Sequence, residues 1–236
     1  HLAETLLSQE WKRVHTTIVS SAYRRTSSRL GVYVDAGLAI GKLAVLLQQL
    51  WQLGDVLEIG TIERIRKLLG MHFLALHMKG YRAIAIHMRQ YSEELLRRFS
   101  DENGGPPRKA QTPWIEVSFE FDMEQGVFFV TCRRHLGGLV YLVRCFRFDL
   151  VQPVNNLCRE VTRWTRASDA KLRRLFGYLL TTLEAALVLK VADHHGIEDM
   201  GVLGHSDSNQ GDSKEAGRST SGWLCGVGSE DFESYG

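Results

Sequence analysis

Residues 30–41 read LGVYVDAGLAIG and set one aspartate, Asp35, inside an apolar run. A lone buried carboxylate is costly unless it pairs with a cation or holds a metal ion. The residues themselves favour a simple explanation, in which Asp35, Ala36 and Gly37 form a turn between a short strand and a helix. The alternative is that the Asp35 carboxylate binds a ligand such as a metal ion. The surrounding sequence is needed to distinguish a turn from a ligand site.

The sequence on either side of this stretch predicts short regular elements. Residues 2–11 have the spacing of a short amphipathic helix, and the segment that runs through Trp51 favours a second helix. Residues 71–87 form two apolar runs around Gly80, which predicts a β-hairpin. Residues 88–99 predict a third helix, because large apolar side chains recur at every fourth position.

The second half of the chain begins with a break. Residues 100–113 contain Gly-Gly-Pro-Pro and are the best linker candidate. Residues 114–131 alternate apolar and polar side chains, and they are either a hairpin with VFFV (127–130) as its second strand or a disordered connector. Residues 135–190 are predicted to be helical. The polar stretch from residue 193 onward contains two short strand candidates, VLGHSD and GWLCGV.

The composition describes a globular chain with unevenly distributed charge. With 236 residues, 44% hydrophobic and 24% charged, the chain suits one large domain or two ordinary ones and is too apolar for disorder. No apolar run reaches the length of a membrane span, and the chain begins at His1 with no signal peptide and no methionine, as a fragment would. The net charge is +2, but nine acidic and only two basic residues follow residue 192. The preceding part is therefore basic, which suits either a nucleic-acid-facing body or ordinary solvated charge.

Cysteines and histidines form no recognisable metal motif. The four cysteines make no C-x-x-C pair, and they suit reduced thiols in an intracellular protein, either cytoplasmic or nuclear. Among the nine histidines, His194 with His195 and His72 with His77 have no ligand partner at a useful spacing. The sequence therefore predicts no zinc site.

Two boxes near the end of the chain change the interpretation of Asp35. Residues 205–208 are His-Ser-Asp-Ser, and residues 218–223 are Arg-Ser-Thr-Ser-Gly-Trp. They resemble the two boxes that open the ribonuclease H domain in the pol polyprotein of copia-type LTR retrotransposons. Once these boxes are recognised, VYVDA at 32–36 is similar to the Tyr-Val-Asp-Asp box of the reverse transcriptase palm, with Ala36 in place of the second aspartate.

Further segments are similar to this family in the same order along the chain. They are HLAETLLSQEW at the start, LLGMH (68–72) after the palm box, QYSEELLRRF (90–99) as the first thumb helix, HLGGLVYLVRCFRFDL (135–150) as the connecting segment, and NNLCREVTRW and LRRLFGYLLTTLEAALVL as the helices before ribonuclease H. Phe148 departs from the family, which usually has proline there. The resemblance covers nearly the whole chain, and the order of the segments carries it more than any single motif.

The resemblance implies an α+β fold with a truncated reverse-transcriptase palm and thumb, a helical connection and incomplete ribonuclease H-like strands. The expected domains are the truncated palm and start of the thumb in residues 1–99, a linker or connector in 100–134, the helical connection in 135–192, and the N-terminal part of a ribonuclease H-like domain in 193–236. For residues 110–131 the resemblance favours a variable connector over a packed hairpin.

The resemblance also implies a metal chemistry of which most ligands are missing. Nucleotide addition and RNA cleavage in this family use paired Mg²⁺ ions, which prefer carboxylate oxygens. Asp35 matches the first aspartate of the palm pair, Ala36 offers no ligand, and the upstream palm aspartate would precede His1. Asp207 matches the first ribonuclease H acid, and its partners would follow Gly236. We therefore expect a pseudoenzyme in which Asp35 and Asp207 are incomplete metal sites that do not bind Mg²⁺ tightly.

A chain that has lost its catalytic metal ligands can still bind nucleic acid through its basic side chains. The resemblance implies that Arg97 and Arg98 on the thumb helix, together with Arg173 and Arg174 on a later helix, face an RNA–DNA hybrid or another duplex. Arginines that contact phosphates give affinity without sequence preference. The expected partner is therefore a nucleic-acid duplex, bound weakly and nonspecifically, and no membrane.

Two alternatives stay open. The arginines could belong to solvated helix faces, since Glu93 and Glu94 precede Arg97 and Arg98 by four residues, the spacing of helical ion pairs. The second alternative is another function class, a helical protein-interaction module with no nucleic-acid role, built on the apolar stripe of residues 172–183.

Overall fold

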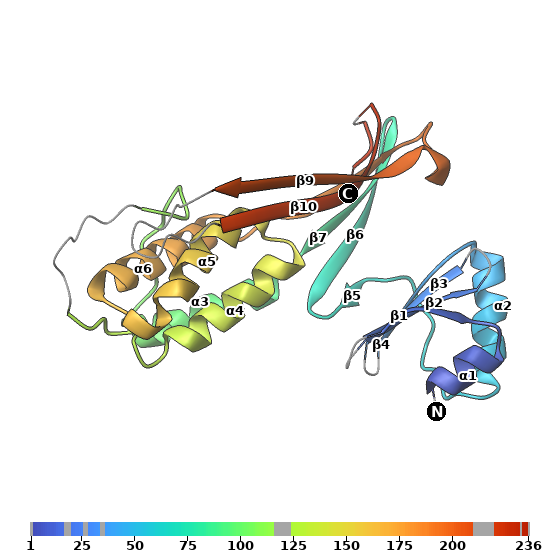
Figure 1. Ribbon diagram of the computed structural model, residues 1–236, viewed down its shortest axis with the longest axis horizontal. Coiled ribbons are helices and arrows are strands. Elements are labelled where there is room, and N and C mark those ends of the chain that lie inside the picture. Colours follow the sequence, from blue (N-terminus) through green and yellow to red (C-terminus); the bar gives the residue numbers. More distant parts are fainter. Residues whose placement is uncertain are drawn as a thin grey trace. The chain divides into compact units, whose positions relative to one another are not determined.

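The computed structural model shows a mixed α+β protein with six helices and three antiparallel sheets in the part of the chain that it describes (Figure 1). The described residues are 2–16, 20–25, 28–33, 36–115, 124–209, 220–231 and 233–235. The chain divides into two compact units, His1–Leu68 and Leu69–Gly236. The general α+β class expected from the sequence is therefore confirmed.

The first unit is a four-stranded antiparallel sheet with two helices. In sheet order its strands are β1 (Lys12–Thr16), β2 (Ser20–Arg25), β3 (Ser28–Tyr33) and β4 (Ala36–Ile40), and its helices are α1 (Leu2–Ser8) and α2 (Leu43–Gly54). Buried side chains from the helices and from one face of the sheet form its core: Leu6, Trp11, Tyr23, Leu30, Leu50 and Leu53. The unit ends at the two-residue strand β5 (Lys67–Leu68).

The expected turn from a strand directly into a helix at residues 35–37 is wrong. Ala36 begins strand β4, which pairs antiparallel with β3, and helix α2 starts only at Leu43. The alternation of burial along β3 explains the pairing, because Leu30 is buried while its neighbours Arg29 and Gly31 are exposed. Such period-two burial suits a sheet with one covered face.

The second unit contains a three-stranded antiparallel arrangement beside a helical bundle. The strands are β6 (Met71–Met78), β7 (Tyr81–His87) and β8 (Leu187–Ala192), with β7 in the middle. The expected hairpin within residues 71–87 is confirmed, and Gly80 makes its turn at φ 89°, a backbone conformation that favours glycine. Residues 187–190 were expected to be helical, but they belong to β8, because the apolar side chains there pair with β7.

Four helices build the bundle and its aromatic core. They are α3 (Arg89–Asn103), α4 (Cys132–Cys145), α5 (Val151–Glu160) and α6 (Arg166–Thr181), with short 3-10 turns at Phe148–Leu150 and Val161–Arg163. Helix α3 contains the helix expected over residues 88–99 except for Met88, and it ends at Asn103, where Gly104 follows in the left-handed region at φ 76°. Residues 100–103, which were expected to begin the linker, therefore belong to this helix. The rings of Phe99 and Phe176 stack at 4.1 Å between centroids, and Phe128 packs beside Phe99 at 5.3 Å.

The segment before α4 is packed rather than extended. VFFV (127–130) forms turns, so the expected second strand of a hairpin there is wrong, and residues 116–123 lie outside the described residues. The carboxylate of Asp169, only 1% exposed, explains the packing. It accepts hydrogen bonds from the backbone N–H groups of Val127 (2.6 Å) and Phe128 (3.2 Å) and from the indole of Trp164 (2.7 Å).

The last elements are two long paired strands. These are β9 (Met200–Asn209), preceded by a 3-10 turn at Ile197–Asp199, and β10 (Thr220–Ser229). They contain the two strand candidates VLGHSD and GWLCGV, which are therefore confirmed. Beyond β10, Tyr235 bridges to both Lys190 of β8 and Gly228 of β10, so this segment lies between the two strands.

Among the described residues, no helix is long and apolar enough to cross a membrane.

We expect Asp169→Ala to destabilise the second unit by about 3 kcal/mol, because the change leaves the backbone N–H of Phe128 and the indole N–H of Trp164 buried without an acceptor. Urea denaturation, monitored by tryptophan fluorescence, measures the loss of unfolding free energy. Asp101→Ala is the control, since Asp101 pairs with Arg97 on the exposed face of α3. Equal losses in the two variants would contradict this role for Asp169.

We also expect the stability of this unit to fall below neutral pH because of His135. Its ring is 3% exposed among the rings of Phe99, Phe128 and Phe176. Burial, with a smaller effect of Arg134, lowers the pKa of His135 to about 4. Glu102 lies 2.8 Å from the imidazole and would favour its charged form, but Arg134 pairs with the same carboxylate.

The unfolded chain protonates His135 near its ordinary pKa of about 6.5, so the stability contribution is complete above that value and is lost as the pH falls toward about 4. The slope is at most about 1.4 kcal/mol per pH unit within this window. Denaturation series at several pH values should show a shallower slope for His135→Phe than for the unaltered chain. Identical slopes would show that the imidazole does not titrate as described.

Candidate nucleic-acid interface

Three basic side chains form a row across the sheet of the first unit. Lys12 of β1 pairs in register with Arg24 of β2, and Arg24 pairs with Arg29 of β3. All three are exposed. Side chains directly opposite each other on neighbouring antiparallel strands point to the same face, about 4.5–5.5 Å apart at Cβ.

The row lies on the face of the sheet that the helices leave open. Tyr23 and Leu30, the sequence neighbours of Arg24 and Arg29, are buried in the core with α1 and α2. Because successive side chains of a strand point to opposite faces, the row points away from that core. Like charges placed opposite each other across strands are destabilising, so this arrangement favours an anionic partner.

No acidic group compensates the row within the described part of the chain. Lys12 and Arg24 have no carboxylate within ion-pair distance there, and the Arg29 guanidinium donates only to the carbonyl of Ser28, at 3.2 Å. Arg25 provides a contrast, because it points to the other face. It lies 3.5 Å from the carboxylate of Glu10 and donates to the side-chain oxygen of Gln52 at 2.9 Å.

Two large side chains extend the row on the same face. Ile40 of β4 pairs in register with Arg29 and is 61% exposed. Tyr33 lies four residues beyond Arg29 along β3 and is 41% exposed. Four residues along a strand span about 13 Å, so the Tyr33 ring shares the face of the basic row without touching it. Surfaces that bind nucleic acids commonly combine cations that contact phosphates with exposed rings that stack on bases.

Asp35 lies outside the described residues, as does Val34. The residues that flank them are described: β3 ends at Tyr33, β4 begins at Ala36, and these two residues pair directly. The palm-like box of the sequence therefore spans the junction of two antiparallel strands. Tyr33, the first side chain of that box on the open face, belongs to the same face as the basic row.

Asp207 is exposed near the end of β9, where it pairs in register with Gly222 of β10. It belongs to no cluster of three potential metal ligands among the described residues. Residues 210–219, which include Arg218 of the second box, lie outside the described residues. Within its described part, the structure therefore places Asp207 in no three-ligand metal site.

Arg97 and Arg98 lie together on α3 but share an acidic partner. Glu94 bonds to Arg97 at 2.9 Å and to Arg98 at 2.6 Å, and Arg97 also pairs with Asp101 at 2.9 Å. The hydrogen bonds from both arginines lower the pKa of Glu94 to about 2. The i,i+4 pair of Glu94 with Arg98 follows the predicted spacing, whereas Glu93 pairs with Arg89 instead of Arg97.

Arg173 and Arg174 of α6 bind other parts of the second unit. Arg173 donates to the side chain of Asn103 at 2.9 Å, and its guanidinium lies 5.0 Å from the centroid of the Phe128 ring. Arg174 donates to the carbonyl of Thr112 at 3.0 Å and to its hydroxyl at 2.6 Å. All four arginines expected to bind nucleic acid thus have intramolecular partners, and phosphate contacts would compete with these.

The basic row was not foreseen from the sequence. KRVHT and SSAYRR, which form β1 and β2, are short, polar and basic, and they lack the apolar alternation that predicts a strand. One signal was present, because SRLGVY alternates Arg29, Leu30 and Gly31 in the manner of a half-buried strand. Only the pairing of strands reveals that Lys12 and Arg24 belong beside Arg29.

No protein-family model matches the chain, and no solved structure matches it. The similarity to copia-type elements therefore rests on the motifs of the sequence and on their order.

Proposed function

We propose that this chain is a fragment similar to the reverse transcriptase–ribonuclease H region of copia-type elements, and that it binds nucleic-acid duplexes without sequence preference and without catalysis. The observation that carries the binding proposal is the row of Lys12, Arg24 and Arg29 on the open face of the first sheet, which no acidic group among the described residues compensates. Its position on the same face as Tyr33 of the palm-like box agrees with the resemblance.

The chemistry of the row favours phosphate groups as ligands. Three cations at cross-strand spacing attract the nucleic-acid backbone and release condensed counterions when they neutralise phosphates. Contacts of these cations to phosphates carry no sequence information. The expected partner is therefore an RNA–DNA hybrid or another duplex, bound more weakly as the salt concentration rises.

The proposed lack of catalysis rests on the carboxylate count. A Mg²⁺ pair needs several oxygen ligands around it. Ala36 occupies the second acidic position of the palm-like box, and Asp207 has no acidic neighbour in a potential ion site among the described residues. Because charge neutralisation by metal ions dominates phosphoryl-transfer catalysis, the chain lacks the main catalytic contribution.

The alternative function as a helical protein-interaction module gains no support from the described structure. Leu172, Leu175, Phe176 and Leu179 of the apolar stripe are fully buried in the core of the second unit. Leu180 and Leu183 of the stripe are partly buried against the same core, so most of the stripe is covered by the chain's own side chains.

We expect the triple variant Lys12→Gln, Arg24→Gln and Arg29→Gln to weaken duplex binding and to flatten its salt dependence. Each lost phosphate contact reduces the log–log salt slope by about 0.9 for a DNA duplex, so the full row accounts for a change of up to about 3. Filter binding or fluorescence anisotropy with a duplex of arbitrary sequence, measured at several salt concentrations, gives both quantities.

The matched control removes the same charge elsewhere, with Lys79, Arg108 and Lys109 changed to glutamine. These three cations are exposed in the second unit. The control is expected to keep most of the salt slope. A control that weakens binding as much as the triple variant, or a native chain with no salt-sensitive binding, would contradict the proposed interface.

We expect neither the native chain nor Ala36→Asp to extend a primer on an RNA or DNA template with Mg²⁺. Restoring one carboxylate gives a single acidic pair, and a Mg²⁺ pair needs more oxygen ligands than that. Incubation of an RNA–DNA hybrid with the native chain should likewise leave the RNA intact. Extension or cleavage by the native chain above a matched Asp35→Asn, Asp207→Asn preparation would overturn the proposed inactivity.

A further inference from the structure

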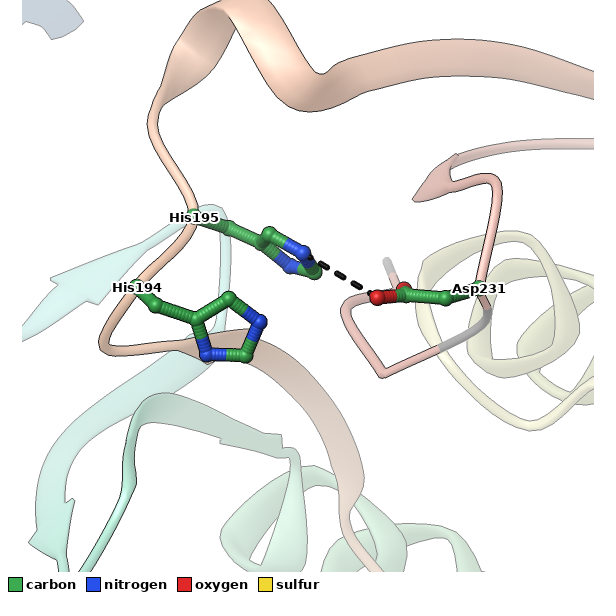
Figure 2. Close-up of side chains that lie close together, drawn as sticks. All are labelled: His194, His195 and Asp231. Atoms are coloured by element: carbon green, nitrogen blue, oxygen red, sulfur yellow. Dashed lines mark ion pairs between the residues drawn. The ribbon is translucent and has the colours of Figure 1, made fainter.

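Three potential metal ligands meet in the second unit. His194 and His195 follow the end of β8, and Asp231 follows the end of β10. Figure 2 shows the two imidazoles on one loop and the Asp231 carboxylate facing them from the other segment. One ligand atom from each residue lies within 4.8 Å of the others.

His195 is held in position from both sides of its ring. Its Nε2 lies 3.2 Å from Oδ2 of Asp231, and its Nδ1 lies 2.7 Å from the hydroxyl oxygen of Ser234. Ser234 is fully buried, and its hydroxyl also accepts the backbone N–H of Ala192 at 2.8 Å. An imidazole fixed through one nitrogen by a buried partner presents its other nitrogen in a constant direction, as metal-binding histidines do.

Asp231 is held as a charged acceptor. Its Oδ1 accepts a hydrogen bond from the Ser229 hydroxyl at 2.6 Å and another from the backbone N–H of Glu233 at 3.0 Å. The hydrogen bond from Ser229, followed by that from Glu233, lowers the pKa of Asp231 below its ordinary value. Because both bonds use Oδ1, Oδ2 is left facing His195.

His194 is more exposed than His195. Its side chain is 63% exposed, and its ring lies 4.2 Å from that of His195 between centroids. Its Nε2 lies 3.6 Å from a carboxylate oxygen of Glu233, which is also exposed. An exposed imidazole can rotate toward an ion at little cost, and Glu233 offers one more oxygen beside it.

We propose that His194, His195 and Asp231 form a binding site for a divalent transition-metal ion of the zinc class. Tetrahedral bonds of about 2.0–2.1 Å put neighbouring ligand atoms about 3.3 Å apart. Nε2 of His195 and Oδ2 of Asp231 already have this separation, at 3.2 Å. Two imidazoles with one carboxylate suit zinc and its neighbours, whereas Mg²⁺ prefers oxygen ligands alone.

The site would join two segments that are distant in the sequence. His194 and His195 extend from β8, while Asp231 belongs to the segment that places Tyr235 between β8 and β10. An ion bound to all three would stabilise this junction by mass action, since the ligands come together only in the folded chain. Three protein ligands leave a fourth position for Glu233 or water.

The sequence predicted no zinc site because the nearest motif-like pair, His194-His195, has no third ligand close by. Asp231 comes close to this pair through the antiparallel pairing of β9 with β10 and through the bridge from Tyr235 to Lys190 of β8. The inference is independent of nucleic-acid binding, which was assigned to the first unit.

The test is isothermal titration of the chelator-stripped full chain with Zn²⁺, and with Co²⁺ for its absorption spectrum. We expect one saturable Zn²⁺ site per chain and a tetrahedral Co²⁺ spectrum without thiolate charge-transfer absorption. His194→Ala is the decisive variant, because an exposed side chain can be removed without unfolding the unit. It should weaken Zn²⁺ binding about tenfold or more, as should Asp231→Asn.

His77→Ala is the matched control, since His77 is an equally exposed histidine on β6. It should bind Zn²⁺ as the native chain does, and circular dichroism should show that all variants keep the native fold. The proposal is overturned by a native chain without a saturable site, by His194→Ala and Asp231→Asn that bind normally, or by a thiolate signal that assigns the ion to a cysteine.

Discussion

The register of the four-stranded sheet in the first unit is the constraint on which the functional account depends. A strand alternates its side chains between two faces, so a shift of one residue would exchange every side chain between them. In the observed register Tyr23 and Leu30 enter the core, and Arg24 and Arg29 therefore occupy the open face. The same register pairs Tyr33 with Ala36 and sets the palm-like box at the junction of two strands.

The arginines of α3 and those of the basic row differ in their acidic partners for a geometric reason. On α3, a glutamate one turn away is within reach of an arginine, so Glu94 neutralises Arg97 and Arg98 locally. On a strand, the nearest side chains on the same face come from the neighbouring strands, and for Arg24 these are the cations Lys12 and Arg29. Among the described residues, Lys12, Arg24 and Arg29 of the sheet therefore have no acidic partner, whereas Arg97 and Arg98 of the helix do.

The sequence predicted the elements whose signals are local. The helix from residue 88, the helix through Trp51 and the hairpin around Gly80 each carry their own periodicity or turn residue, and the structure contains all three. Strand β8 was missed because its pairing with β7 joins residues about a hundred positions apart. The turn at 127–130 was missed because its folding depends on the distant carboxylate of Asp169.

The candidate sites show the same limit. Asp207 could be named from a motif, but its surroundings could not, and Asp35 lies outside the described residues. The basic row and the His194–His195–Asp231 group each combine side chains from separate strands, and no single stretch of sequence contains either. Both groups can be recognised only when the strand pairing is known. The sequence alone therefore favoured the arginines of the helices as the nucleic-acid-binding residues.

Nuclear magnetic resonance of the arginine side chains during titration with a short duplex of arbitrary sequence tests the central claim most directly. It observes the Nε–H signal of each arginine separately, so it distinguishes the open sheet face from the helices. The account predicts that the signals of Arg24 and Arg29 shift together as duplex is added and return as salt is raised, while those of Arg97, Arg98, Arg173 and Arg174 stay close to their starting positions. Shifts confined to the helix arginines, or no shift at Arg24 and Arg29, would contradict it.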